Sequence, residues 1–401
     1  MPVSKPIYLD YAATTPLDAR VLAAMQPYFS EDPSSPLSGS LGTSFGNPSS
    51  VHGFGQRAEA ALEEARQKMS SLLNAQPEEI IFTSGGSESD NLALRGAALA
   101  AREQRGATHL LISPVEHDAV SKTAGQLAAH FGFTLETLPV DEFGMVPPQE
   151  VAKRLREDTA LVSIILGNNE IGTINPISEI AAICRTRGLP LHSDAVQSGA
   201  YLHLDVQKLG VNLLSIGAHK FYGPKGVGAL YVRNGTKLLP TQTGGGHEFG
   251  LRAGTPNVAY IAGMAKAFEL AQSELNQRTS KLINLRDKII DSVLVTIPDS
   301  KLTGHRHLRL ANHASFVFNN VDGNALLMLL DDAGFACSSG SACKTGDPEP
   351  SEVLLALGFA RDWALGSLRV TLGIQTTDEE IDSFLSALPQ LVERARNLEL
   401  A

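Results

Sequence analysis

A lysine in a tight, glycine-bounded turn is the first residue whose surroundings favour chemistry. Lys220 follows the apolar run 213–216 and lies between Gly217 and Gly223. A lysine in a confined site can lose its proton and form a Schiff base with a carbonyl compound. Because most lysines are solvated surface groups, Lys220 alone does not establish such a site.

Two other segments have the residue types that bind a charged cofactor. In residues 83–89 a strand-like run ends, two glycines turn, and a helical pattern opens on hydroxyl and acidic side chains. The free N–H groups and the dipole of such a helix start bind phosphate, although a capped helix with a glycine turn has the same pattern. Asp194 ends the run 189–193, at the edge where open α/β sheets bind ligands, and it could also cap the next helix.

The three features in combination predict one cofactor. Pyridoxal phosphate requires a lysine for its aldehyde, a carboxylate for its pyridinium nitrogen and a cradle for its phosphate. Lys220, Asp194 and the segment 83–89 supply these groups. Residues 83–89 are followed by no Gly-Lys-Ser/Thr and contain no Gly-x-Gly-x-x-Gly pattern, so they do not resemble a nucleotide-binding loop.

A cysteine in a small, polar segment could act as a nucleophile. Cys343 lies between Ser338-Ser339-Gly340-Ser341-Ala342 and Lys344-Thr345-Gly346-Asp347-Pro348, a composition typical of an exposed mobile loop. A buried structural cysteine is the usual alternative, and it is our prediction for Cys184. For Cys337 we favour a packing role over a second sulfur relay. The thiolate is the reactive form of such a residue.

The elements that must position these residues alternate between strand and helix. Apolar runs at 79–83, 109–113, 161–166, 189–193 and 213–216 are separated by amphipathic segments such as 87–105 and 120–130. This alternation predicts an α/β fold with a largely parallel sheet. A long helical pattern over 258–293 would connect it to a smaller α+β domain. We therefore expect a large cofactor-binding domain at 16–257, and a small domain formed by 1–15 and 258–401 that carries the cysteine loop.

Composition excludes several classes of protein. The 401 residues carry a formal charge of −10 without a long basic run, which argues against a dedicated nucleic-acid binder. No apolar stretch reaches the roughly 20 residues of a membrane helix. Three cysteines form no disulfide framework, which favours a reducing cytoplasm. Residues 30–50, rich in Ser, Gly and Pro, predict a loop of the kind that often covers an active site.

The ordered motifs of the chain resemble those of the cysteine desulfurases. These NifS- and IscS-like enzymes belong to the class V aminotransferase family and have the fold of type I pyridoxal-phosphate enzymes. The resemblance spans nearly the whole chain, at residues 8–16, 45–52, 83–91, 168–172, 192–198, 218–220, 244–248, 252–255 and 338–343. It implies a mainly parallel seven-stranded sheet with a smaller α+β domain.

The resemblance also implies the catalytic roles. Lys220 would bind the cofactor covalently and move protons, with Asp194 on the pyridine nitrogen. His117 would stack on the ring and assist proton transfer. Arg369 would bind the substrate carboxylate, a task that suits a guanidinium. Cys343 would receive the sulfur as a persulfide.

The remaining cofactor contacts follow from the same resemblance. Gly86, Ser87 and His219 would hold the phosphate, and Thr255 would reach it from the partner subunit, which implies a homodimer. Gln197 and Asn169 would contact the ring hydroxyl and the bound amino acid.

The implied reaction removes sulfur from L-cysteine to give L-alanine, and passes the sulfur to an iron–sulfur scaffold or a tRNA-thiolation relay. One alternative is another enzyme of the same fold, either a selenocysteine lyase or an aminotransferase. An aminotransferase would need no thiol on a loop. The other alternative is a non-catalytic scaffold protein. No metal, membrane or stable nucleic-acid partner is expected.

The sequence departs from the family pattern in three places. Gly217 stands where the family usually has a serine, so a hydroxyl contact to the phosphate is expected to be missing. Residues 28–46 are longer than the corresponding family segment. The chain also ends without the extended tail by which some members dock a scaffold. The sequence Ser338-Ser339-Gly340-Ser341-Ala342-Cys343 resembles that of the family subgroup in which the cysteine lies on a long, mobile loop.

Overall fold

The computed structural model describes residues 6–29, 45–339 and 349–399. Its larger sheet has seven strands in the order β2-β8-β7-β6-β5-β3-β4. These are β2 (Ile80–Thr83), β3 (His109–Ile112), β4 (Thr134–Thr137), β5 (Thr159–Ser163), β6 (Leu191–Asp194), β7 (Leu213–Gly217) and β8 (Gly228–Val232). Only β8 runs antiparallel to its neighbours, which confirms the mainly parallel α/β sheet.

Successive side chains of each central strand belong to two different cores, one on each face of the sheet. Ile81, Leu110, Leu161, Leu213 and Leu230 pack with α3 (Gly86–Arg105) and α4 (Asp118–Phe131). Their neighbours Phe82, Leu111, Val162, Leu214 and Tyr231 pack with α2 (Gly53–Leu73), α6 (Ile177–Thr186) and α8 (Val258–Ser273). Because strand side chains alternate with a period of two, a sheet covered on both faces needs continuous apolar runs, as observed.

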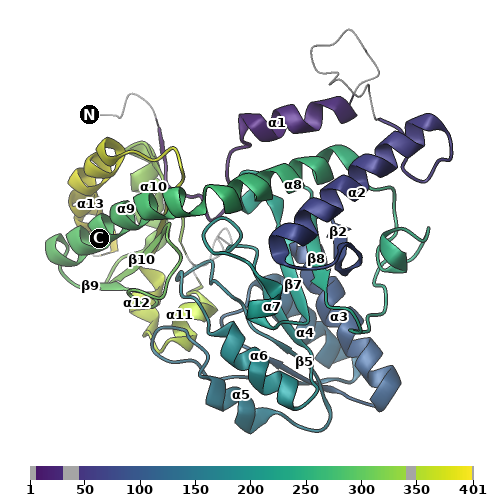
Figure 1. Ribbon diagram of the computed structural model, residues 1–401. Helices are drawn as coiled ribbons and strands as arrows, with labels where there is room; N and C mark the ends of the chain where they lie inside the picture. The colour runs from purple at the N-terminus through teal and green to yellow at the C-terminus, as the bar shows by residue number, and fades with distance from the viewer. Residues whose placement is uncertain (1–5, 30–44, 340–348, 400–401) are drawn as a thin grey trace.

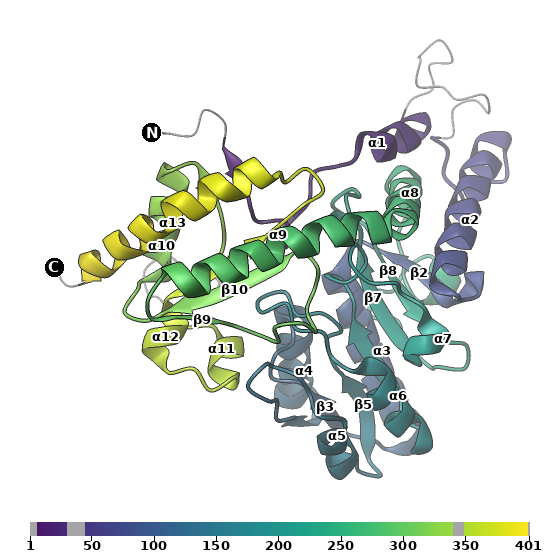
Figure 2. The ribbon, with the colours of Figure 1, turned by 60° about the vertical axis from the view of Figure 1, so that its left-hand side comes forward.

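A smaller antiparallel sheet, in the order β12-β10-β9, lies apart from the first (Figure 1). It contains β9 (Ser300–Leu302), β10 (His313–Phe318) and β12 (Ser367–Thr371). The helices α9 (Leu275–Thr296), α10 (Gly323–Asp332) and α13 (Asp378–Glu399) lie beside it (Figure 2). The chain start also lies here, since β1 (Ile7–Tyr8) pairs with β11 (Phe335–Ala336). The domain limits at 15/16 and 257/258 remain a prediction.

The single helix expected over residues 258–293 is two helices in the structure. The pattern over 258–293 forms α8 and α9, which meet at Glu274, where φ is −98° and ψ is 8°. Helix α8 packs beside α2 on the large sheet, and α9 continues toward the small sheet (Figure 1). The junction follows from the two different surfaces that these helices must cover.

Short elements complete the described chain: α1 (Ala19–Met25), η1 (Gln26–Tyr28), η2 (Pro77–Glu79), α5 (Pro148–Arg154), α7 (Val206–Leu209), η3 (Ala218–Lys220), η4 (Glu248–Gly250), α11 (Glu352–Ala356) and α12 (Arg361–Leu365). Most of the predicted loop at 30–50 lies outside the described residues. Among the helices of the described ranges, none has the length and apolarity needed to span a membrane.

Candidate active site

Most of the predicted site residues meet in one cavity of about 320 Å³. It opens at the carboxyl ends of β5, β6 and β7, the edge predicted from Asp194. Its lining includes Gly86, Ser87, His117, Asn169, Asp194, Gln197, His219, Lys220 and Arg369. Residues from nearly 300 positions apart thus converge on one site.

Lys220 lies in η3, directly after β7, with its amine in the cavity. Its Nζ donates hydrogen bonds to the carbonyl oxygens of Ala12, at 2.5 Å, and Ala13, at 2.8 Å. Burial and the charge of Arg369 lower the pKa of Lys220 to about 8, against the opposing effects of Asp10 and Asp194. The neutral form of this amine, which a Schiff-base lysine requires, is therefore far more populated near physiological pH than in an ordinary lysine.

Asp194 is buried at the end of β6. One of its oxygens accepts a hydrogen bond from the N–H of Val196 at 2.8 Å. Burial raises the pKa of Asp194, while His117 in its protonated form, the N–H of Val196 and the positive charge of Lys220 oppose the rise. A buried carboxylate in a cavity is well suited to a cationic ring nitrogen, because that charge would compensate its desolvation.

The start of α3 is the segment from which a phosphate cradle is expected. The helix begins at Gly86 after Gly85, whose φ of 156° gives an extended turn. A Cβ atom at Gly86 would lie 2.5 Å from Cγ2 of Val196, so the backbone approaches the cavity wall more closely than a larger residue allows. Nearby, Nδ1 of His219 forms a hydrogen bond with Oγ1 of Thr14 at 3.1 Å, and burial lowers the pKa of His219 to about 4. A neutral imidazole and a helix N-terminus together fit a phosphate group.

His117 precedes α4 and caps it. Its Nδ1 accepts a hydrogen bond from the N–H of Ala119 at 3.1 Å. The proton of the neutral ring is therefore on Nε2. The exposed ring lines the cavity, as expected for a residue that stacks on the cofactor.

Arg369 lies on β12 of the small sheet and reaches the cavity from there. It donates to the carbonyl oxygen of Asn169 and to Oδ1 of Asp10, both at 3.0 Å. Its buried Nε has no hydrogen-bond partner among the described residues. The guanidinium thus keeps one unsatisfied donor beside the cavity.

The N-terminal segment contributes more than sequence reasoning assigned to it. The carbonyl of Ala12 accepts hydrogen bonds from both Lys220 and Nε2 of Gln197, and Asp10 pairs with Arg369. Residues 8–16 belong to the family resemblance, which implied no role for them. Their position in a recurring motif was the only signal, because the contacts span about 200 to 360 residues.

Two predicted residues are not brought into this cavity. Thr255 lines a different, small cavity with Thr83, Ser84 and Arg252. Its contact with the partner's cofactor stays a prediction. Cys343 lies outside the described residues, as do Gly340 to Pro348.

The ends of the cysteine segment are described, and both lie near the cavity. Ser338 exchanges backbone hydrogen bonds with Arg369, at 2.7 and 3.2 Å. On the other side, the hydroxyl of Ser351 donates to Glu170, the neighbour of Asn169. The described residues on either side of this segment therefore lie beside Arg369 and Glu170.

The other cysteines pack in apolar surroundings. Cys184 is buried in α6, and burial raises the pKa of its thiol to about 12. Cys337 packs against the same core, and burial raises its pKa as well. Both thiols stay protonated, so the prediction of packing roles agrees with the structure.

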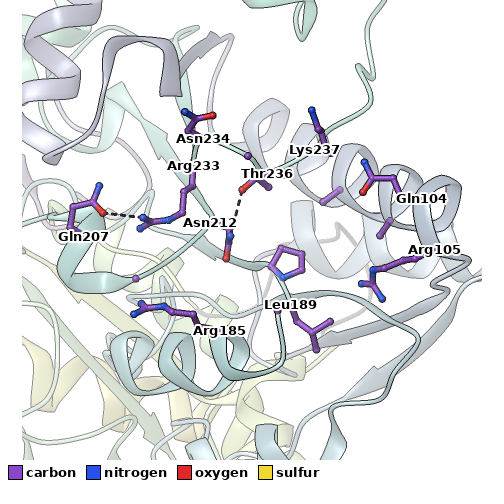
Figure 3. Close-up of a pocket in the computed structure, with 16 residues that line it drawn as sticks. Gln104, Arg105, Arg185, Leu189, Gln207, Asn212, Arg233, Asn234, Thr236 and Lys237 are labelled. Atoms are coloured by element: carbon purple, nitrogen blue, oxygen red, sulfur yellow. Dashed lines mark hydrogen bonds between the residues drawn. The ribbon is translucent and has the colours of Figure 1, made fainter.

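A second and larger cavity, of about 680 Å³, opens at the opposite, amino edge of the sheet (Figure 3). None of the predicted site residues lines it. Arg105 donates to the carbonyls of Glu157 and Thr159, and Arg233 donates to those of Val206 and Val211. These arginines therefore hold the cavity wall together.

Comparison with known proteins agrees with the site. The model of the aminotransferase class-V family matches residues 7–384. A protein of Dictyoglomus turgidum named cysteine desulfurase IscS is 46% identical over 99% of this chain and 97% of its own length. One of the same name from Methanosarcina thermophila is 43% identical over 98% and 94%.

Solved structures give the same result. A NifS-like protein superposes with a TM-score of 0.87 at 36% identity, covering 97% of this chain and all of its own. A structure described as SspA in complex with cysteine has a TM-score of 0.77 at 33% identity, covering 92% of this chain and 99% of its own. On the strength of the family match and of these full-length relatives, the chain belongs to the aminotransferase class-V family.

Proposed function

We propose that this protein is a pyridoxal-phosphate-dependent cysteine desulfurase, which converts L-cysteine to L-alanine and carries the sulfur on Cys343. The observation that carries the proposal is the convergence of Lys220, Asp194 and Arg369 on one cavity. The full-length relatives named as cysteine desulfurases support the choice of reaction.

Each polar group of the cavity has a task in this reaction. Pyridoxal phosphate supplies the aldehyde that binds the amino acid and the ring that accepts electrons from its Cα. Lys220 would hold the cofactor in the resting enzyme and would be the base beside the substrate Cα. Asp194 stabilises the positive charge of the ring nitrogen.

Arg369 orients the substrate. Its free Nε and the Nη atoms that now contact Asp10 and Asn169 form a planar set of donors for the carboxylate of cysteine. Arg369→Lys is expected to raise the KM for cysteine at least tenfold, because the ammonium cannot bind bidentately.

Cys343 takes the sulfur. Its thiolate forms an S–S bond with the substrate sulfur, the C–S bond breaks, and the electron pair of that bond remains with the substrate carbon. Protonation of this carbon, with Lys220 as the nearest proton donor, gives alanine. Cysteine and one thiol thus yield alanine and one persulfide, without an external oxidant. The positions of Ser338 and Ser351 beside the cavity support this role.

The wider context is also part of the proposal. We propose a homodimer in which Thr255 reaches the partner's phosphate, and a cytoplasmic location where thiols stay reduced. The sulfur acceptor would be an iron–sulfur scaffold or a tRNA-thiolation relay, and the IscS name of the relatives favours the first. No observation favours the selenocysteine-lyase alternative.

Product analysis tests the reaction. The wild-type protein, incubated with L-cysteine and a reductant, is expected to form sulfide and alanine in equal amounts. Cys343→Ala should keep the yellow chromophore and lose both products, while Cys337→Ala, the same change at a packed cysteine, should keep both. Turnover of Cys343→Ala at the wild-type rate contradicts the proposal.

A further inference from the structure

A second acidic side chain, Asp90, lies next to Asp194 and has no role in the proposed desulfurase reaction. Asp90 of α3 is 1% exposed, yet it lines the active-site cavity. One oxygen of Asp90, one of Asp194 and a ring nitrogen of His117 all lie within 4.8 Å of one another. Asp90 takes this position because α3 packs across β6 and β7.

The surroundings of Asp90 give little compensation for a negative charge. Its Oδ1 accepts no hydrogen bond from the described residues. The closest ring nitrogen, Nε2 of His192, is 3.5 Å away. Burial lowers the pKa of His192 to about 3, so this ring is neutral and provides no counter-charge.

The ring of His192 is also held in place. Oγ of Ser163 contacts its Nδ1 at 2.8 Å, and Oγ of Ser215 contacts its Nε2 at 3.0 Å. Another buried acid, Glu116, lies close enough that its ionisation would disfavour an ionised Asp90 further. A hydrogen bond from Ser215 is the one effect that favours an ionised Asp90, and burial with the charge of Asp194 outweighs it, so that the pKa of Asp90 is well above its usual range.

Asp194 is better placed to be the ionised member of the pair. It accepts the N–H of Val196, the charge of Lys220 favours its ionised form, and His117 does so in its protonated form. Two carboxylates this close in a buried site cannot both be charged without a large cost. The shared proton therefore belongs on the residue with fewer donors and cations, which is Asp90.

We propose that Asp90 is a positioning residue for the cofactor nitrogen: as a neutral carboxylic acid behind Asp194, it leaves Asp194 as the single negative charge that faces the ring. The inference rests on the proposed function for the identity of that ring. Asp90 acts through Asp194. If Asp90 were ionised, its charge would add to that of Asp194, and nearby cations such as Lys220 would lose their protons less readily.

Infrared spectroscopy tests the proton directly. The difference spectrum between the wild-type holoenzyme and Asp90→Asn should contain the carbonyl stretch of a protonated carboxylic acid, which shifts in D₂O. Taking the difference removes the signal of Glu116, whose pKa burial raises to about 8. A difference spectrum with carboxylate bands and no such carbonyl band overturns the proposal.

A visible titration provides the functional readout. Asn has the shape of the neutral acid, so Asp90→Asn should shift the apparent pKa of the lysine-bound chromophore by less than about 0.3, whereas Asp194→Asn should lower it by about one or more. A shift in Asp90→Asn as large as that in Asp194→Asn shows that Asp90 carries the charge, and contradicts the proposal. A wild-type protein that binds no chromophore contradicts the proposed function instead, and the infrared band still reports on Asp90 in that case.

Discussion

At the scale of single residues, burial and two neighbours with opposite charges, Arg369 and Asp10, set the pKa of Lys220. Arg369 lowers its pKa and Asp10 raises it, while burial has the largest effect and brings it to about 8. Arg369 lies on β12 and Asp10 lies in the N-terminal segment. The small sheet and the N-terminal segment therefore both influence the reactivity of a lysine that directly follows strand β7 of the large sheet.

The first prediction is therefore a pH dependence. Only the neutral amine reacts with the cofactor aldehyde, so the rate at which apoprotein binds pyridoxal phosphate should rise with pH through about 8. Stopped-flow absorbance measures this rate. Arg369→Gln should move the midpoint to higher pH, and Asp10→Asn should move it to lower pH. Shifts of the same sign in both variants would contradict the electrostatic explanation.

A second residue-scale prediction concerns Gly217, where the family usually has serine. A Cβ atom there would lie 3.5 Å from the backbone nitrogen of Gly86 in the phosphate cradle, and 3.3 Å from Cγ1 of Val196. The backbone of Gly217 is extended, with φ −126° and ψ 122°, so a side chain causes no backbone strain. Gly217→Ser is expected to tighten cofactor binding by roughly tenfold, since a hydrogen bond to a charged group contributes about 1.5–3 kcal/mol.

Gly217→Ala is the matched control, because it adds the Cβ atom without the hydroxyl. Equilibrium dialysis against pyridoxal phosphate measures both variants. Equal affinities for the serine and alanine variants would show that the hydroxyl does not reach the phosphate.

At the scale of elements, the start of α3 is fitted against the segment that follows β6. A Cβ atom at Gly86 would lie 2.5 Å from Cγ2 of Val196, and a valine cannot swing away as a long side chain can. Gly86→Ala is expected to displace Val196, whose N–H donates to Asp194, and to weaken cofactor binding about tenfold or more.

A double-mutant cycle measures this fit. Val196→Ala should restore most of the affinity that Gly86→Ala loses, because it removes the colliding methyl groups. Gly125→Ala in α4 serves as the control, since no atom beyond the neighbouring backbone of its own helix lies within 4 Å of the added Cβ. That change should leave affinity unaltered and stabilise the helix by about 0.5–1 kcal/mol. Additive losses in the cycle would show that the two residues act independently.

At the scale of the whole molecule, local patterns predicted the parts better than their assembly. The strand-like runs became β2, β3, β5, β6 and β7, because a sheet buried on both faces requires continuous apolar runs. The expected site residues around Lys220 and Asp194 also meet, since carboxyl ends of parallel strands share one edge.

The parts that sequence reasoning missed depend on distant contacts. The strands β4 and β8 were not predicted, and β8 takes its place by antiparallel pairing with β2 and β7. The role of Ala12 depends on a carbonyl oxygen, which every residue possesses, so no side chain marked it. The break between α8 and α9 at Glu274 lies within an unbroken helical pattern, and only the separate packing of the two helices explains it.

One buried ion pair links helix α2, the short helix η4 and strand β2 of the large sheet. Arg66 of α2 and Glu248 of η4 form two hydrogen bonds of 2.9 Å, and each side chain is 3% exposed. Glu248 also accepts the N–H of Phe82 in β2 at 2.8 Å, while the guanidinium lies 5.0 Å from the centre of the Phe82 ring. Three elements that are separated in the sequence thus depend on one pair of charges.

Breaking this pair should destabilise the whole protein. Glu248→Gln leaves the buried Arg66 cation with the half-exposed carboxylate of Glu63 as its remaining counter-charge. This change is expected to cost about 3–5 kcal/mol in the free energy of unfolding, and calorimetry should show a lower Tm. The double variant Arg66→Met/Glu248→Leu should recover most of that loss, because it removes both charges at once. Lys153→Gln, which breaks the exposed pair with Glu150, should leave Tm unchanged. If Glu248→Gln behaved like Lys153→Gln, the buried pair would not be what joins α2, β2 and η4.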